Sequence, residues 1–476
     1  MMLYFTYANK YKNIETENEN FYILNESMKN TINKKLILLL GATVVALICL
    51  MLLLGLTLAG VVKPAGKPDE SNSSIPESMS HEGYKLEKVV VLSRHNIRSP
   101  LSGGDSLLGS VTEHEWFEWT SPASQLSLRG GSLETNMGQF FRKWLETEGL
   151  FPENYQPDEG DVRIYANAKQ RTIATAQFFA AGLLPTVNED VEYHGEFDTM
   201  DPVFNPQLTY ISDGYIKAAK QQIDELYSNE VSELADNYEL IEDVIDMDDS
   251  PAMKDGSIQT FRTDDTVITL EKNKEPTMEG SLKTACSVSD ALTLQYYEEP
   301  DPVKAAFGNS LSEEQWTEIA DVKDVYNDVL FASPLVACNV ANPLLKVIRS
   351  EMNEEEREFT FLCGHDSNIG SVLAALDTKN YDLPATIEKK APIGVKLIFT
   401  KWKSGSGELF WDADLMYQTT DQLRNADILD EQNHPASVDI DFNGLSQNND
   451  SLYTDEDIKN RLTQAIKEYD KLADYD

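Results

Sequence analysis

Residues 89–100 read Val-Val-Val-Leu-Ser-Arg-His-Asn-Ile-Arg-Ser-Pro. The first four side chains form a continuous apolar run that is rich in β-branched residues, which is typical of a strand buried on both faces. Directly after this run come Arg94, His95 and Arg98. Open α/β sheets bind their ligands outside the carboxyl ends of their strands. The stretch therefore predicts an α/β fold with a binding site at the end of this strand.

A second junction between strand and helix has the same design. Residues 162–166 (Val-Arg-Ile-Tyr-Ala) predict a strand. Residues 172–182 predict a helix, because they are rich in alanine, apolar at helical spacing and closed by Gly182. The link between the two elements ends with Arg171, which we expect at or near the start of the helix.

A third junction carries a histidine and an acid. Residues 359–363 (Phe-Thr-Phe-Leu-Cys) predict a short buried strand, and His365 and Asp366 follow it. Asp366 or Ser367 can cap the helix that is predicted to follow, and a helix N-terminus favours an anion. The chain has six histidines, and two of them stand just after predicted buried strands. We therefore expect the three junctions to form one site.

The side chains at these junctions fit the chemistry of phosphoryl transfer. The planar guanidinium of arginine recognises phosphate with two hydrogen bonds and keeps its charge, so Arg94, Arg98 and Arg171 would neutralise a phosphoryl group. A histidine among them can attack phosphorus. Asp366 can protonate the leaving oxygen, which it does best at acidic pH. This mechanism needs no metal and no cofactor, and we expect neither.

The paired motifs resemble those of a known family. The Arg-His-x-x-Arg-x-Pro motif of residues 94–100, followed far downstream by the His-Asp pair of residues 365 and 366, is similar to the motifs of the histidine acid phosphatases. These enzymes are branch 2 of the histidine phosphatase superfamily, and the resemblance covers residues 84–445. The family usually has Gly where this chain has Asn96. The Arg-His-Asn form resembles the bacterial glucose-1-phosphatases within the family.

The resemblance implies a role for each residue of the motifs. His95 would be the nucleophile that forms a phosphohistidine, and Asp366 would protonate the leaving oxygen before water hydrolyses the intermediate. Four other side chains would bind the phosphate of a small phosphomonoester: Arg94, Arg98, Arg171 and His365.

The resemblance also implies a fold. In this family a mostly parallel central sheet is flanked by helices and interrupted by a smaller, mostly α-helical domain, with the substrate between the two. We expect the α/β phosphatase domain to comprise residues 84–204 and 331–476. The helical cap domain would comprise residues 205–330.

The substrate follows less directly from the sequence. As a carboxylate, Glu196 could accept hydrogen bonds from sugar hydroxyls and would repel a polyphosphorylated substrate; a solvated surface role is the alternative. Glucose-1-phosphate is therefore the preferred substrate and phytate the runner-up. A third hypothesis is a surface protein that binds phosphate without turnover, although such a protein would have no need of Asp366.

Composition limits the remaining possibilities. The chain has 476 residues, with 80 acidic and 40 basic side chains and a net charge of -40. We expect no nucleic-acid partner, because phosphate backbones need clustered Lys and Arg. Three cysteines, Cys286, Cys338 and Cys363, lie beyond the N-terminal region. They allow at most one disulfide, and buried reduced thiols are the simpler expectation. Composition does not predict the oligomeric state.

The N-terminal region predicts an extracytoplasmic enzyme. Residues 36–62 contain no charged side chain, and this run is longer than the roughly 20 residues that span a bilayer. Lysines precede the run, which favours a cytoplasmic segment 1–35, with Met28 as a possible true start. A flexible tether would follow over 63–83. The first hypothesis is a single-pass anchor with the catalytic domain outside the cell membrane, and the alternative is secretion after signal cleavage.

Overall fold

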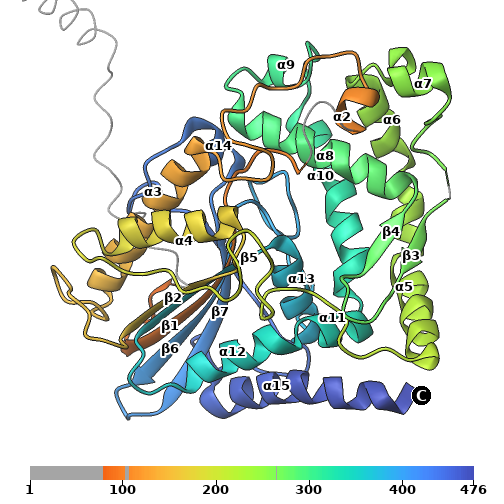
Figure 1. Ribbon diagram of the computed structural model, residues 1–476. Helices are drawn as coiled ribbons and strands as arrows, with labels where there is room; N and C mark the ends of the chain where they lie inside the picture. The colour runs from red at the N-terminus through yellow and green to blue at the C-terminus, as the bar shows by residue number, and fades with distance from the viewer. Residues whose placement is uncertain (1–78, 102–106, 264, 476) are drawn as a thin grey trace, which may run out of the picture. The chain divides into compact units, whose positions relative to one another are not determined.

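The computed structural model describes residues 79–101, 107–263 and 265–475 (Figure 1). The predicted cytoplasmic segment, the run 36–62 and most of the predicted tether lie outside these residues. In the part of the chain that the structure describes, no helix is both long enough and apolar enough to cross a bilayer. The described residues belong to one compact unit. Met79, at their start, is already buried, and its carbonyl oxygen accepts a hydrogen bond from Trp144 Nε1 at 2.7 Å.

A seven-stranded mixed sheet forms the centre of the α/β part (Figure 1). The three strands that lead to the predicted site are parallel to one another, whereas each later strand pairs antiparallel with its neighbour. The predicted α/β class is therefore confirmed, and the antiparallel half is a feature that the sequence did not reveal. The path runs β2 (Val162–Ala166), β5 (Phe359–Gly364), β1 (Tyr84–Arg94), β6 (Lys396–Ser404), β7 (Leu409–Tyr417), β8 (Ala436–Asp439), and β9 (Tyr453–Thr454) pairs with β7.

Strand β1 is buried on both faces, as its apolar run predicted. Val89 and Val91 pack in a hydrophobic cluster with α3 (Leu128–Thr147) and α4 (Gln170–Leu183). Val90 and Leu92 pack in a second cluster on the opposite face. Helices of that face are α12 (Asn342–Asn353), α13 (Asp366–Ala375) and α15 (Asp455–Glu468). In Figure 1, α3 and α4 lie above the sheet, and α12 and α15 lie below it.

The segment of residues 205–340 is mostly helical and supplies most of a large hydrophobic cluster, to which residues outside it such as Ile97 and Ile393 also belong. Its short hairpin pairs β3 (Val267–Thr269) with β4 (Thr277–Glu279). Its helices are α5 (Asp213–Glu233), α6 (Ala235–Val244), η2 (Met247–Asp249), α7 (Pro251–Asp255), α8 (Ser281–Glu298), α9 (Pro302–Ala305), α10 (Glu313–Asn327), η3 (Asp328–Ala332) and α11 (Pro334–Val340). The other short elements are α2 (Leu107–Ser110), α14 (Thr420–Asn425) and η4 (Tyr469–Tyr475).

The register of the parallel strands brings the three junctions together. Arg94 of β1 lies opposite Gly364 of β5, and Ala166 of β2 lies opposite Cys363. The backbone N–H of His95 donates to the Gly364 carbonyl oxygen at 3.0 Å. The three strands therefore end at the same level, and the side chains that follow them share one edge of the sheet.

Helices α3 and α4 approach each other closely through two glycines. A β-carbon added to Gly138 of α3 would collide with the backbone carbonyl oxygen of Phe179, and one added to Gly182 of α4 would collide with that of Thr135. Backbone atoms cannot move aside as a flexible side chain can. The close contact matters for the site, because Arg171 lies in the first turn of α4.

We predict that Gly138→Ala lowers the free energy of unfolding by about 1–3 kcal/mol, which is the usual cost of overpacking. Urea denaturation measures this change. The matched control is Gly370→Ala in α13, where an added β-carbon would meet no atom within 4 Å. The control should be neutral or should stabilise by up to about 1 kcal/mol, since alanine favours helix. Equal destabilisation by both substitutions would contradict the packing argument.

Candidate active site

His95 is presented as a neutral imidazole. It is the first residue after β1, and its side chain is buried. Its Nδ1 lies 2.9 Å from the carbonyl oxygen of Asn96. A carbonyl only accepts, so Nδ1 carries the hydrogen and the lone pair is on Nε2. Burial and the nearby Arg171 hold the pKa of His95 well below its ordinary value. The ring is thus uncharged, and the lone pair of its Nε2 is available.

Asn96 fixes the loop that carries His95. Its Nδ2 donates to Glu134 Oε2 of α3 at 2.8 Å, and its Oδ1 accepts from the backbone N–H of Ile97 at 2.8 Å. Glu134 also pairs with Lys396 of β6 at 2.9 Å, and both side chains are fully buried. The asparagine that departs from the family's usual glycine therefore connects the loop to a buried ion pair.

His365 comes from the third junction and lies beside His95. The two ring centroids are 5.5 Å apart, with an angle of 72° between the ring planes. Asn167 Oδ1 accepts from the backbone N–H of Asp201 at 2.8 Å, so its Nδ2 donates to His365 Nε2, 2.6 Å away. Burial and Arg171 lower the pKa of His365 well below its ordinary value.

Two of the predicted arginines line the cavity beside these rings. Arg98 NH2 contacts both carboxylate oxygens of Asp290 at 3.2 and 3.0 Å. Arg171 NH2 lies 3.4 Å from His365 Nδ1. Burial and the charge of Arg98 lower the pKa of Arg171 to about 10. Because burial and the charge of Arg98 disfavour the charged form of Arg171, an anion bound beside it would stabilise that form.

The third arginine lies differently. Arg94 is buried, its NH1 donates to Glu388 Oε1 at 2.7 Å, and its NH2 is 3.4 Å from Asp366 Oδ2. It is not among the described residues that line the cavity. One feature is common to Arg94, Arg98 and Arg171: in the part of the chain that the structure describes, the Nε of each is buried and has no hydrogen-bond partner.

Asp366 lies between two cations. Arg94 approaches its Oδ2 from β1, and Lys323 of α10 lies 3.1 Å from the same atom. Burial raises the pKa of Asp366, but the charges of Lys323 and Arg94 outweigh that effect and hold it well below its usual range. The predicted helix cap is wrong by one or two residues. The N-cap of α13 is His365, whose backbone N–H donates to Asn368 Oδ1 at 2.9 Å.

These groups line a cavity of about 340 Å³ with walls from both parts of the chain. The α/β part supplies side chains from the ends of its strands, and the helical segment supplies residues such as Lys283, Asp290 and Lys323. Glu196 is exposed and lies outside this lining. Glu275, next to the β3–β4 hairpin, does line the cavity. Among the described residues of the lining, Glu275 is therefore a further carboxylate beside Asp290 and Asp366, whereas Glu196 is not part of it.

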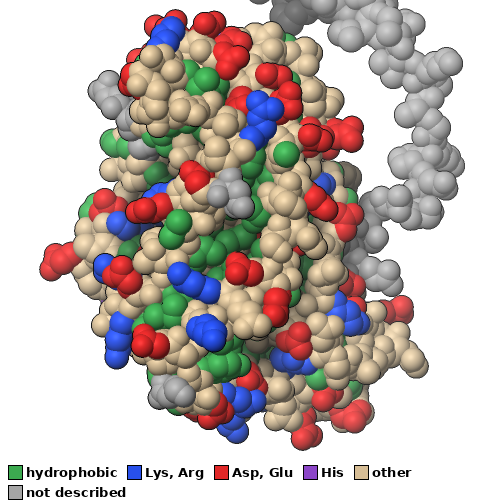
Figure 2. Space-filling view, turned by 90° about the vertical axis from the view of Figure 1, so that its right-hand side faces the viewer, with side chains coloured by type: hydrophobic (Ala, Val, Ile, Leu, Met, Phe, Trp, Pro, Cys, Tyr) green, Lys and Arg blue, Asp and Glu red, His purple; other side chains and the backbone are tan. Residues whose placement is uncertain are grey.

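The surface charge does not point to the site. Acidic and basic side chains are mixed over the face shown in Figure 2. The net charge of -40 repels anions, so phosphate must be drawn by the local charge of buried arginines. Among the described residues, no group of three or more His, Cys, Asp or Glu is arranged as metal ligands. Cys286, Cys338 and Cys363 are free thiols, as expected.

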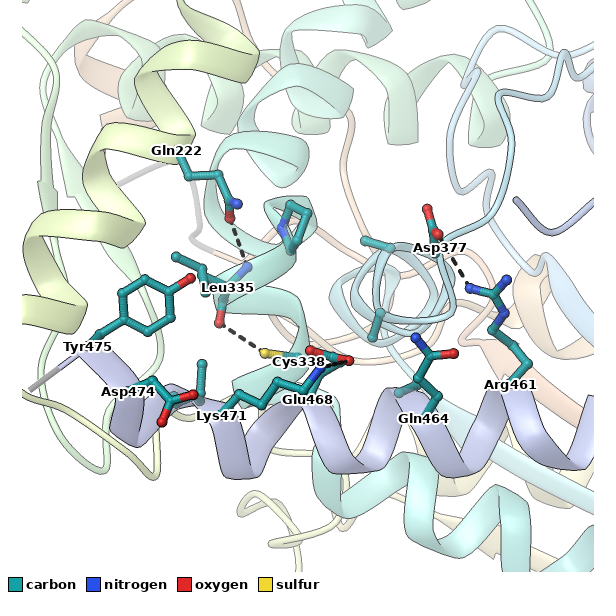
Figure 3. Close-up of a pocket in the computed structure, with 15 residues that line it drawn as sticks. Gln222, Leu335, Cys338, Asp377, Arg461, Gln464, Glu468, Lys471, Asp474 and Tyr475 are labelled. Atoms are coloured by element: carbon teal, nitrogen blue, oxygen red, sulfur yellow. Dashed lines mark hydrogen bonds and ion pairs between the residues drawn. The ribbon is translucent and has the colours of Figure 1, made fainter. Parts of the chain in front are cut away.

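A second cavity, of about 510 Å³, lies among α5, α11, α13 and α15 (Figure 3). Its polar groups pair with each other. Arg461 NH1 lies 3.3 Å from Asp377 Oδ2, and Gln222 Oε1 accepts from the backbone N–H of Leu335 at 2.8 Å. None of the site residues predicted from the sequence lines this cavity. The chemistry is therefore assigned to the cavity at the strand ends.

The sequence family agrees with this geometry. The model of the histidine phosphatase superfamily (branch 2) matches residues 85–416. The chain belongs to this family. It is therefore a phosphatase of the histidine acid phosphatase type.

Relatives with assigned activities cover most of the chain. It is 37% identical to the glucose-1-phosphatase of Salmonella typhimurium, over 78% of this chain and 91% of the relative. It is 35% identical to the glucose-1-phosphatase of Providencia rettgeri, over 80% and 92%. Identity to phytase AppA of Escherichia coli is 26%, over 78% and 90%.

Solved structures agree with the fold. The Citrobacter braakii phytase superposes with a TM-score of 0.72 at 25% identity, over 81% of this chain and 98% of that one. The apo form of the Hafnia alvei phytase gives a TM-score of 0.75 at 24% identity, over 82% and 99%.

Some residues of the site have no clear signal in the sequence. Asn167 directly follows β2, as His95 follows β1. The expectation that ligands bind at the carboxyl ends of strands could therefore have identified it. Lys323 stands in the middle of a helix, and Glu388 stands in a loop before β6. Nothing in their neighbourhoods distinguishes them from surface charges, since their partners come from distant parts of the chain.

We predict that inorganic phosphate stabilises the protein by binding at Arg171. At a phosphate concentration 100 times the Kd, the stabilisation should be about 2.7 kcal/mol, which a thermal melt detects as a higher Tm. Arg171→Met should lose most of this shift. The control is Arg262→Met, an exposed arginine that pairs with Glu239 outside the cavity. A full phosphate shift in Arg171→Met would show that phosphate binds elsewhere.

Proposed function

We propose that the protein is an extracytoplasmic acid phosphatase that hydrolyses sugar phosphates, with glucose-1-phosphate preferred, through a phosphohistidine on His95. One observation carries the proposal: the His95 and His365 rings lie 5.5 Å apart in a cavity that Arg98 and Arg171 also line. A phosphoryl group between the rings would meet guanidinium groups whose Nε atoms have no partner among the described residues. Such charge stabilisation is the main requirement of phosphoryl transfer.

In the first half of the reaction, the lone pair of His95 Nε2 attacks phosphorus while Arg98 and Arg171 hold the phosphoryl oxygens. His365 lines the cavity beside these oxygens. The bond between phosphorus and the leaving oxygen breaks, and Asp366 gives that oxygen a proton. The products are a free sugar and phosphohistidine. Arg94 holds Asp366 in place from behind, which is its role in the observed geometry.

In the second half, water attacks the phosphohistidine and the nitrogen–phosphorus bond breaks. The electron pair returns to Nε2 of His95, and the proton of the water passes to Asp366. The backbone contact of His95 Nδ1 with Asn96 keeps Nε2 directed toward phosphorus in both halves, because the ring cannot turn without losing that hydrogen bond.

The preference for a sugar phosphate rests on the cavity and on the relatives. Glu275 lines the cavity, so its carboxylate could accept hydrogen bonds from sugar hydroxyls and would repel further phosphate groups. The relatives at 37% and 35% identity are glucose-1-phosphatases, and the phytase relative is 26% identical. The second candidate is a phytase-type activity, which Lys283 favours because it brings a further cation to the same cavity.

The domain arrangement and location are also proposals. One hydrophobic cluster drawn mostly from the helical segment, and two clusters on the faces of the sheet, support an α/β domain of residues 84–204 and 331–476 and a helical cap of residues 205–330. The uncharged run 36–62, outside the described residues, supports a single-pass anchor in the cell membrane, with secretion after cleavage as the alternative. Both place the catalytic domain outside the cytoplasm.

We predict that Asp366→Asn slows phosphoenzyme formation from a sugar phosphate far more than from an aryl phosphate, because only a poor leaving group needs the proton. A loss of about 10²–10⁴-fold is typical of a missing acid. The assay measures phosphoenzyme formation from glucose-1-phosphate and from p-nitrophenyl phosphate by rapid quench at pH about 5, in chelator, because the later decay step is common to both substrates. His95→Ala is the control for the chemistry and should lose both activities. Turnover by His95→Ala equal to wild type would refute the proposed function.

We predict that Glu275→Gln lowers kcat/KM for glucose-1-phosphate by about tenfold and lowers it less for p-nitrophenyl phosphate, since the loss of a hydrogen bond to a charged group is worth roughly 1.5 kcal/mol or more. Phytate hydrolysis should rise relative to wild type. Glu196→Gln is the matched control and should change none of these rates. If Glu196→Gln changed these rates and Glu275→Gln did not, Glu196, which the sequence indicated, would again be the candidate sugar-binding carboxylate.

A further inference from the structure

Lys323 occupies a position that the reaction as described does not use. It lies on α10, in the helical segment, and its side chain is 7% exposed. Its Nζ is 3.1 Å from Asp366 Oδ2 and 3.2 Å from Glu388 Oε1. It also lines the same cavity as His95. A buried ammonium group thus sits between two carboxylates, one of which belongs to the proposed proton donor.

Glu388 anchors this arrangement. Its Oε1 accepts from Arg94 NH1 at 2.7 Å, and its Oε2 accepts from the Tyr297 hydroxyl at 3.2 Å and from the backbone N–H of Ile393 at 3.0 Å. Burial raises the pKa of Glu388, but Arg94 and Lys323 outweigh burial and lower it to about 2. Glu388 therefore stays ionised and keeps Lys323 in place beside Asp366.

The two halves of the reaction need opposite protonation states of Asp366. The first half needs a proton donor, and the second half needs a carboxylate that takes a proton from water. Two cations within 3.4 Å of one oxygen favour the carboxylate. A phosphate ester carries a proton below its second pKa of about 6. In acidic medium the substrate can therefore bring the proton that Asp366 passes to the leaving oxygen.

We propose that Lys323 is a positioning residue for the second half of the reaction, where its ammonium group, between Asp366 and Glu388, holds Asp366 as the carboxylate that accepts the proton of the attacking water. In this step the water oxygen bonds to phosphorus, the nitrogen–phosphorus bond breaks, and its electron pair returns to His95 Nε2. The inference rests on the proposed role of Asp366.

Lys323 is the group by which this idea can be tested. The titratable or charged side chains that face Asp366 come from several elements: Lys323 and Tyr326 of α10, Arg94 of β1, Arg171 of α4, Cys286 of α8, and His95 and His365 of the two loops. Arg94 is less suitable, since its removal would take from Glu388 its shortest ion pair, at the end of β1. Lys323 belongs to the opposite wall, and its substitution leaves the Arg94–Glu388 pair intact.

The experiment measures the formation and the decay of the phosphoenzyme by rapid quench with p-nitrophenyl phosphate. In Lys323→Met, decay should slow at least tenfold, as expected when a general base is impaired. Formation should change less than about twofold, because an aryl leaving group needs little proton transfer. Phosphoenzyme then accumulates. Lys323→Arg, which keeps the charge, should retain most of the decay rate.

The pH profile gives an independent readout. Removing a positive charge raises the pKa of Asp366, so the carboxylate is lost at a higher pH as the medium is acidified. The acidic limb of kcat should therefore move to higher pH in Lys323→Met and stay in place in Lys323→Arg. The matched control is Lys390→Met, which removes a lysine that pairs with Asp328 at 3.0 Å and not with Asp366. The control should keep the wild-type profile and decay rate.

The possible outcomes separate this inference from the proposed function. If Lys323→Met slows formation and decay by the same factor, or leaves decay unchanged, the inference is overturned. If Asp366→Asn slows phosphoenzyme formation from aryl and sugar substrates equally, the role of Asp366 as proton donor fails, whatever Lys323 does. Should Lys323→Met not fold, Lys323→Gln takes its place, because an amide can still donate to a carboxylate without the charge.

Discussion

A single backbone hydrogen bond, from the N–H of His95 to the carbonyl oxygen of Gly364, joins the two loops on which the chemistry depends. It continues the parallel ladder of β1 and β5 by one residue beyond the end of β1. The histidines that directly follow the two strands therefore lie next to each other. The ladder is rigid because both faces of β1 are buried under helices. The distance between the imidazoles is thus a consequence of sheet register.

The chemistry of these loops depends on the cationic side chains of the site and on their carboxylate partners. Arginines and a lysine gather in a protein whose net charge is strongly negative. Three of these cations pair with a buried carboxylate: Arg98 with Asp290, and Arg94 and Lys323 with Glu388. Removing one member of such a pair is costly, whereas a bound phosphate adds a further partner. The balance keeps the site folded when empty and leaves a local excess of positive charge for the substrate.

Local patterns predicted the parts of the site that come from strand ends. His95, Arg98, Arg171, His365 and Asp366 all follow buried strands, and the structure brings them together. This pattern did not include Glu196, which is exposed. The pattern also could not identify Glu275. The helical segment packs over the sheet through long-range contacts, and such contacts have no periodic pattern in the sequence.

The sequence by itself determined the fold class, the identity of the nucleophile loop and the family, because strand burial and strand-end chemistry are local properties that a run of ten residues can express. Only the tertiary structure decided that Arg94 supports Asp366 from behind, that Lys323 reaches it from the helical segment, and that Asn96 connects to Glu134. Each of these contacts joins residues far apart in the chain. Their geometry depends on how the helices pack against the sheet, which no single segment encodes.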